Sequence, residues 1–354
     1  MTWLTWRQFR AQAITAAAAL AAFAILLATT EPSLSSMYNS SGLTTCHGDA
    51  CTGLASTFLQ NLSSGGGSFL IPGSAYMILY FLSVLVILIA PAITGCFWGA
   101  PLIARELEAG TFRLTWNQSV TRTRWLTVKL ALIGAAAMAV TEALSLIQAW
   151  WAAPIGKAVG LGGGSSIFSE GRFGWFVFPT HGITPLGYAA FGFALGVTAG
   201  LLARRPVPAM AITLAIFAAV QLAMPLWIRP HLTPPSHTVA GIFAADLAYG
   251  SLTADVVPGH PDAWILSSQA LNPAGQPVTT IPAACSSVSY PGQKGGASAL
   301  TPAQCMQSHG YREAISYLPT SRYWPLQWTE TGIFLALAVA LAGFCFWWLG
   351  RRRI

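Results

Sequence analysis

Six long apolar stretches dominate the pattern of hydrophobic and polar positions along the chain, and the polar residues gather between them. A bilayer core about 30 Å thick takes about 20 residues of α-helix to cross, and every stretch is roughly that long or longer. The pattern therefore predicts six membrane-spanning helices, at Ala11–Thr29, Ala75–Ala100, Trp125–Ala153, Ile183–Ala203, Val207–Trp227 and Thr329–Leu349.

The composition leads to the same class of protein. Of the 354 residues, 54% are hydrophobic and only 8% are charged, whereas soluble domains carry about 25% charged residues. This excludes an ordinary soluble domain and predicts an all-α polytopic membrane protein. The first stretch also resembles a signal peptide, but its exit, LATTEPS, is a poor match to a small-residue cleavage site. We therefore expect the first span to be retained.

The segments between the spans differ in character. Residues 1–10, MTWLTWRQFR, form an amphipathic pattern typical of a short helix lying in the membrane interface. Residues 11–228 form a five-span membrane domain that includes a polar segment at 104–124. Residues 229–328 form a long region between spans five and six. There, Thr301 followed by Pro302 predicts a helix start. Residues 329–354 add the sixth span and a basic tail.

Basic residues decide the orientation. With six spans, one side of the membrane receives both termini, segment 104–124 and the turn at 204–205. That side carries 12 of the 18 Lys and Arg residues, namely Arg7, Arg10, Arg105, Arg113, Arg122, Arg124, Lys129, Arg204, Arg205, Arg351, Arg352 and Arg353. Because cytoplasmic loops are enriched in Lys and Arg, we expect both termini to be cytoplasmic and residues 229–328 to be extracytoplasmic. The charge of +7 reflects this bias, and no dense basic block indicates nucleic-acid binding.

Four cysteines fall in the segments placed outside: Cys46, Cys51, Cys285 and Cys305. Thiols in an oxidising compartment form disulfides, and four cysteines allow three pairings. We favour Cys46–Cys51 with Cys285–Cys305, because each pair closes a short loop; unpaired thiols are the alternative. The histidines lack an H-E-x-x-H or comparable spacing, so we expect no metal site.

Two features within the spans are candidates for packing or chemistry. Gly192, Gly196 and Gly200 form a smooth face that suits close helix packing, either within the chain or at a dimer seam. Glu142 lies in the middle of span three, and an intramembrane carboxylate is a functional candidate by default. The alternative is a neutral Glu142 hydrogen-bonded to Gln221 or to Gln148. Glu330 lies nearer the outer interface, where we expect simple solvation.

The chain lacks the familiar catalytic motifs. It has no S-x-x-K and no G-x-S-x-G pattern, so hydrolytic chemistry has no support and no catalytic residue is assigned. It also has no G-x-x-x-x-G-K-S/T loop to hold ATP phosphates. We therefore expect no directly bound cofactor and no enzymatic activity of the chain by itself.

The polar segment RELEAGTFRLTWNQSVTRTRWLTVKL, residues 105–130, resembles a cytoplasmic segment of the ABC-2 type permease family. That family has E-x-E-x-G-T, an apolar run, a Pro-Val/Ile-Ser/Thr-Arg-like stretch and a Lys entering span three. Its counterparts here are Glu106, Glu108, Gly110, Thr111, Val120, Thr121, Arg122 and Lys129. Ser119 stands where proline is usual. Residues 5–10, TWRQFR, resemble the elbow helix of actinobacterial members in particular.

The resemblance implies a permease subunit that pairs with a second permease, as a homo- or heterodimer, and with separate ABC ATPase subunits that bind ATP and Mg. A helix along the membrane surface from Arg105 to Gln118 would place Glu106, Gly110 and Arg113 near one face. We expect Glu106, Glu108, Gly110, Thr111, Arg113 and Arg122 to couple to the ATPase. Arg124 and Lys129 are expected to anchor to membrane lipid or ATPase carboxylates.

The expected function is export of a hydrophobic or amphipathic substrate across a bacterial plasma membrane. Three alternatives remain at this point. The first is an ordinary positive-inside loop without a partner. The others are a polytopic membrane enzyme and an ion-coupled carrier that uses Glu142, for which inverted repeats would be expected.

Overall fold

The structure is a computed structural model of the whole chain. It describes residues 2–47, 50–64, 75–110, 121–161, 171–242, 257–260, 263–286 and 302–351.

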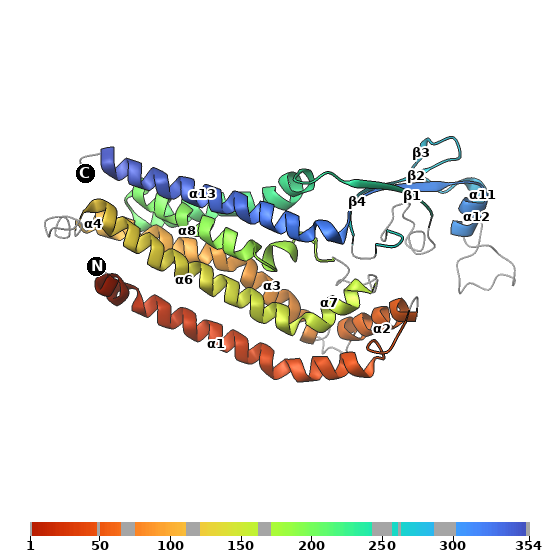
Figure 1. Cartoon of the computed structure of the whole chain (residues 1–354), viewed down its shortest axis with the longest axis horizontal. Helices are drawn as coiled ribbons and strands as arrows, with labels where there is room; N and C mark the ends of the chain where they lie inside the picture. The colour runs from red at the N-terminus through yellow and green to blue at the C-terminus, as the bar shows by residue number, and fades with distance from the viewer. Residues whose placement is uncertain are drawn as a thin grey trace.

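Six helical segments are long and apolar enough to cross a membrane, and they run side by side along the long axis of the molecule (Figure 1). This matches the predicted class, a polytopic helical membrane protein. The segments are α1 (Thr2–Ser40), α3 (Ala75–Thr94) continued by the π-helical turn η1 (Gly95–Gly99) and α4 (Ala100–Glu108), α6 (Arg122–Trp151), α8 (Thr184–Ala203), α9 (Pro206–Ala223) continued by η4 (Met224–Ile228), and α13 (Tyr323–Arg351).

The two ends of the bundle differ (Figure 1). The first turns of α1, the last turns of α13 and the end of α4 lie together at one end, and a small β-sheet projects from the other. Six crossings require both termini to lie on the same side, and the arrangement meets this requirement. The polar segment between spans two and three therefore begins at the end of the bundle that also carries the termini.

Helix α8 is the centre of the bundle. It packs against α3, α4, α6, α9 and α13, and 78% of its most apolar window is buried, the largest share of the six segments. A helix that is hydrophobic all round belongs in the core of a bundle. The spans that cover α8, and α1, which packs on α6, keep apolar faces for lipid or for further protein.

The glycine face of α8 explains how closely its neighbours approach. A Cβ atom on Gly192 would lie 2.7 Å from the carbonyl oxygen of Pro91, and one on Gly196 would lie 2.1 Å from that of Gly95. A Cβ on Gly200 would lie 2.3 Å from the carbonyl oxygen of Ala100. These glycines therefore pack within the chain, against the helix that runs from α3 through η1 into α4.

The other end of the bundle carries two short helices, α2 (Ala50–Ser64) and α7 (Ala153–Gly160), and an antiparallel sheet in the order β1-β4-β2-β3. The strands are β1 (Ser236–Gly241), β2 (Trp264–Leu271), β3 (Pro277–Val278) and β4 (Arg312–Leu318). Strand β4 leads through the turn η6 (Thr320–Arg322) into α13. The sheet is thus attached directly to the start of the sixth span.

Several predicted boundaries were wrong. No helix ends at residue 10, because α1 is continuous from Thr2 to Ser40 and has no proline before Pro32. The segment between the first two predicted spans, residues 30–74, contains the end of α1 and all of α2. The sheet was not predicted either: its strands β1 and β4 pair across about 70 residues of Pro- and Ser-rich sequence, and short strands paired at such distances leave little local signal.

Both predicted disulfides are present. Cys46–Cys51 ties the turn after α1 to the start of α2. Cys285–Cys305 joins α11 (Ala283–Ser286) to α12 (Pro302–Ser308), where a helix start had been predicted; Thr301 itself lies outside the described residues. Cys96 and Cys345 are buried free thiols within the bundle, as expected for cysteines inside spans.

Replacing Cys285 and Cys305 by serine should destabilise the region around the sheet by about 3 kcal/mol, because the disulfide closes a loop of sequence separation 20. Limited proteolysis of the detergent-purified protein should then cut this region faster. The Cys46→Ser/Cys51→Ser variant is the control, because its loop has a separation of only 5 and should expose α2 instead. Equal protection of the sheet region in the first variant and the parent protein would contradict the prediction.

Candidate functional site

The end of α4 and the start of α6 are joined by a salt bridge between Glu106 and Lys129. The Lys129 side chain is only 4% exposed and that of Glu106 17%. The Lys129 ammonium also lies 4.7 Å from the centre of the Trp125 ring, which adds a cation–π contact. The pair thus fixes the two helices that border the polar segment against each other.

Two local signals define where these helices end. Thr121 caps α6, since its side-chain oxygen accepts a hydrogen bond from the backbone N–H of Arg124 at 3.3 Å. Helix α4 ends at Glu108, and Gly110 adopts φ +68°, the left-handed conformation that commonly terminates a helix. Glu108 is exposed beside this turn.

The expected surface helix from Arg105 to Gln118 is therefore wrong at its start. Arg105 to Glu108 are the last turn of the helix that continues span two, and a turn follows at Ala109 and Gly110. Glycine at that position favours termination over continuation. Thr111 and Arg113, also predicted as coupling residues, lie outside the described residues, and the side chain of Arg122 is not described.

Lys129 also does not have its predicted role. We expected it to meet lipid or a partner's carboxylate, but it is buried and bound to Glu106. Of the predicted coupling residues whose side chains are described, Glu106 lies inward in this pair and Glu108 faces outward.

A second polar cluster lies at the opposite end of the bundle, and it was missed. Arg229, in the turn η5 (Arg229–His231), donates two hydrogen bonds to Glu330 of α13, at 2.8 and 3.0 Å. The hydroxyl of Tyr188 donates a third to Glu330 at 2.9 Å. Both charged side chains are 0% exposed, so the predicted solvation of Glu330 is wrong. The Arg229 guanidinium also lies 4.3 Å from the centre of the Phe178 ring.

Gln327, one turn before Glu330, ties the same elements together through its amide. Its oxygen accepts hydrogen bonds from the backbone N–H groups of Ile183 and Thr184, each at 3.1 Å, so it caps the start of α8. Its nitrogen donates to the carbonyl oxygens of Phe178 and His181. Burial lowers the pKa of His181, which keeps this cluster free of a further positive charge at neutral pH.

Glu142 has neither of the predicted hydrogen bonds. Its Oε2 atom is buried and has no hydrogen-bond partner among the described residues. The amide of Gln148 is fully buried and equally unpartnered, as is the Oε1 atom of Gln221. Within the described part of the chain, Glu142 therefore has no hydrogen-bond partner that would explain its place in the span.

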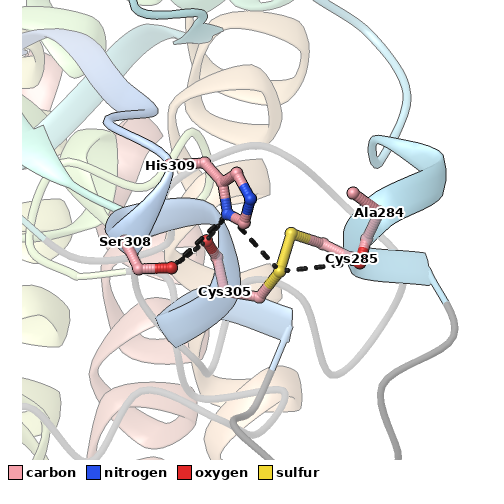
Figure 2. The surroundings of a disulfide bond; sticks show 5 residues. All are labelled: Ala284, Cys285, Cys305, Ser308 and His309. Carbon is pink, nitrogen blue, oxygen red and sulfur yellow. Dashed lines mark hydrogen bonds between the residues drawn. A yellow bond between two sulfur atoms is a disulfide. The ribbon is translucent and has the colours of Figure 1, made fainter.

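One group of three possible metal ligands occurs among the described residues: Cys285, Cys305 and His309, with ligand atoms within 4.8 Å of one another. Figure 2 shows why it does not form a metal site in this state. The two sulfur atoms are bonded to each other, and the Nδ1 atom of His309 lies 2.9 Å from the carbonyl oxygen of Cys305. A carbonyl oxygen can only accept, so Nδ1 is the donor in this contact, and only Nε2 of His309 is left as a ligand atom beside the two bonded sulfur atoms.

Comparison with known families decides the class of the protein. A family model described as "ABC-2 membrane transporter related" matches residues 17–229. The chain belongs to this family. No curated protein and no solved structure matches the chain.

The match covers the first five spans of this ABC-2 permease and ends at Arg229. The family is a membrane component of transporters and is not itself catalytic. Glu330 and Gln327, which bind Arg229 and the start of α8, lie beyond the matched residues. The available signal was the position of Glu330 at the start of an apolar span, because a carboxylate that is buried there must be paired.

Replacing Glu106 by glutamine should destabilise the permease by about 2 to 3 kcal/mol, because it leaves the buried Lys129 ammonium without a counter-charge. Thermal unfolding of the detergent-purified protein measures this. Glu108→Gln is the matched control, since Glu108 is exposed and should change the stability by less than about 0.5 kcal/mol. Exchanging the charges, Glu106→Lys with Lys129→Glu, should recover part of the loss; no recovery would mean that the two side chains do not act as a pair.

Proposed function

We propose that this ABC-2 permease forms the membrane path of an ATP-driven exporter and couples to separate ATPase subunits at the end where α4 stops and α6 begins. The observation that carries the proposal is the junction itself. A turn with an exposed Glu108 is held by helices that the buried Glu106–Lys129 pair fixes together. Force applied at such a turn would pass directly into spans two and three, since close-packed helices transmit strain.

The orientation follows from charge. We place both termini and this junction in the cytoplasm, because Lys and Arg concentrate on that side, and the sheet outside. The two disulfides beside α2 and the sheet suit an oxidising compartment. The membrane we propose is a bacterial plasma membrane.

The transport path requires a second permease. Helix α8 fills the centre of the bundle, so the described chain has no room along its own axis for a substrate. We therefore place the path between two protomers, identical or not, with ATP and Mg bound by the ATPase partners. The many exposed apolar and aromatic side chains of the spans favour a hydrophobic or amphipathic substrate.

Co-purification with the ATPase tests the coupling. Reversing the charges of Glu108 and Arg113 should abolish recovery of the ATPase subunit with the permease while the permease remains folded. The control reverses the charge of Arg172 and Arg322, which are exposed at the other end of the bundle, and should leave the complex intact. An ATPase that stays bound to the first variant and keeps its substrate-stimulated rate would refute the coupling site.

A further inference from the structure

A cleft of ≈ 270 Å³ lies where α1, the turn from η1 to α4, and α6 meet. It has two kinds of lining. Phe9, Trp98, Leu102 and Ile133 form an apolar wall, and Arg105, Glu106 and Lys129 lie among the remaining lining residues, which also include Gln12 and Pro101. The cleft is therefore amphipathic, and it lies at the end of the bundle that carries the termini.

The apolar wall is firmly built. The rings of Phe9 and Trp98 meet edge to face with their centres 4.9 Å apart, and both side chains are less than a tenth exposed. The amide of Gln12 donates a hydrogen bond to the carbonyl oxygen of Phe97 at 3.2 Å, within the π-helical turn η1. Such turns are frequent at functional sites, and here the turn gives the cleft a fixed wall.

The charge of the cleft is positive by one residue. Lys129 and Glu106 neutralise each other in their salt bridge. Arg105 is exposed and forms no ion pair with any described residue. Its guanidinium is thus available for an anion, and arginine matches the geometry of phosphate oxygens with two parallel hydrogen bonds.

We propose that this cleft binds an anionic phospholipid, with the lipid phosphate on Arg105 and the adjoining chain against Phe9, Trp98 and Leu102. The volume excludes an inserted partner helix, whose diameter is about 10–12 Å, and falls just below the range of about 300–1,000 Å³ for drug-sized ligands. It suits a headgroup whose chains continue outside along α1. Only 6% of the most apolar window of α1 is buried, which leaves that route open to the bilayer.

The lipid site does not depend on the ATPase partner. Only its assignment to the cytoplasmic leaflet rests on the orientation given under the proposed function. Its test therefore uses the purified full-length permease alone. Native mass spectrometry compares lipid retention after incubation with phosphatidylglycerol or with phosphatidylcholine of the same acyl chains. The parent protein should retain phosphatidylglycerol preferentially.

Arg105→Gln should reduce the retention of phosphatidylglycerol about tenfold, since it removes a charge-assisted pair of hydrogen bonds. Arg205→Gln is the matched control, an exposed arginine just before α9 that does not line the cleft, and should retain the lipid. Leu102→Trp, which fills the cleft without changing its charge, should reduce retention of both lipids.

Three results would overturn the proposal. The first is unchanged retention in Arg105→Gln. The second is an equal loss in Arg105→Gln and Arg205→Gln, which would indicate diffuse attraction to basic residues. The third is competition by millimolar inorganic phosphate alone, which would identify a soluble anion site instead of a lipid site.

Discussion

Replacing Glu330 by alanine should destabilise the permease by about 3 to 5 kcal/mol, because it leaves the guanidinium of Arg229 buried without a counter-charge. Both side chains are 0% exposed, and Tyr188 loses its acceptor in the same step. Thermal unfolding of the detergent-purified protein, followed by the loss of its monodisperse gel-filtration peak, measures the effect. Arg229→Ala should be comparably harmful.

The double variant separates the pair from its surroundings. Removing both charges, Arg229→Leu with Glu330→Leu, should cost much less than the sum of the single changes, since an apolar replacement of a buried ion pair is often close to neutral. Arg322→Ala, at an exposed position near the same end, should change the stability by less than about 0.5 kcal/mol. If the double variant lost as much stability as the two single variants together, Arg229 and Glu330 would not stabilise each other.

The spans were predictable because a bilayer imposes a length and a composition on each of them. The start of α8 illustrates this: a span was predicted from Ile183 to Ala203, and the helix runs from Thr184 to Ala203. Ends that leave the bilayer were less predictable. Outside the apolar core nothing in the hydropathy marks where a helix stops, and α1 continues well past the predicted end at Thr29 to Ser40.

The polar pairs were not predictable because the sequence does not show which partner a charge will meet. Glu106 and Lys129 were both recognised as notable residues, but they were expected to face outward. Their 23-residue separation becomes a contact only once α4 and α6 pack side by side. Glu330 and Arg229 are 101 residues apart with the sheet between them. Both pairs arise from tertiary packing that local patterns do not encode.

The two buried ion pairs lie at opposite ends of the bundle. Glu106–Lys129 joins spans two and three where the termini lie, and Arg229–Glu330 joins the end of span five to span six near the sheet. Helix α8 contacts α4 and α6, which the first pair joins, and also α9 and α13. A movement of the α4–α6 junction would therefore be transmitted to the other end through the contacts between α8 and its neighbours. The closest of these contacts depend on the glycines of α8.

Replacing Gly196 by alanine should accordingly destabilise the permease by about 3 kcal/mol, the upper end of the usual cost of overpacking. The added Cβ would lie 2.1 Å from the carbonyl oxygen of Gly95 and 2.9 Å from the backbone nitrogen of Ala100. Backbone atoms cannot rotate away as a flexible side chain can, so α8 must separate from η1 and α4. Thermal unfolding and the yield of folded protein measure the outcome.

Gly343→Ala is the matched control for Gly196→Ala. Gly343 also lies within a membrane-spanning helix, α13, but no atom of another described element lies within 4 Å of the place that an added Cβ would take. This change should leave the stability within about 0.5 kcal/mol of the parent protein or raise it slightly. The glycine series should also be graded: Gly200→Ala, at 2.3 Å, should be nearly as harmful as Gly196→Ala, and Gly192→Ala, at 2.7 Å, less so. A Gly196→Ala protein as stable as Gly343→Ala would mean that α8 does not pack against the π-helical turn through its glycines.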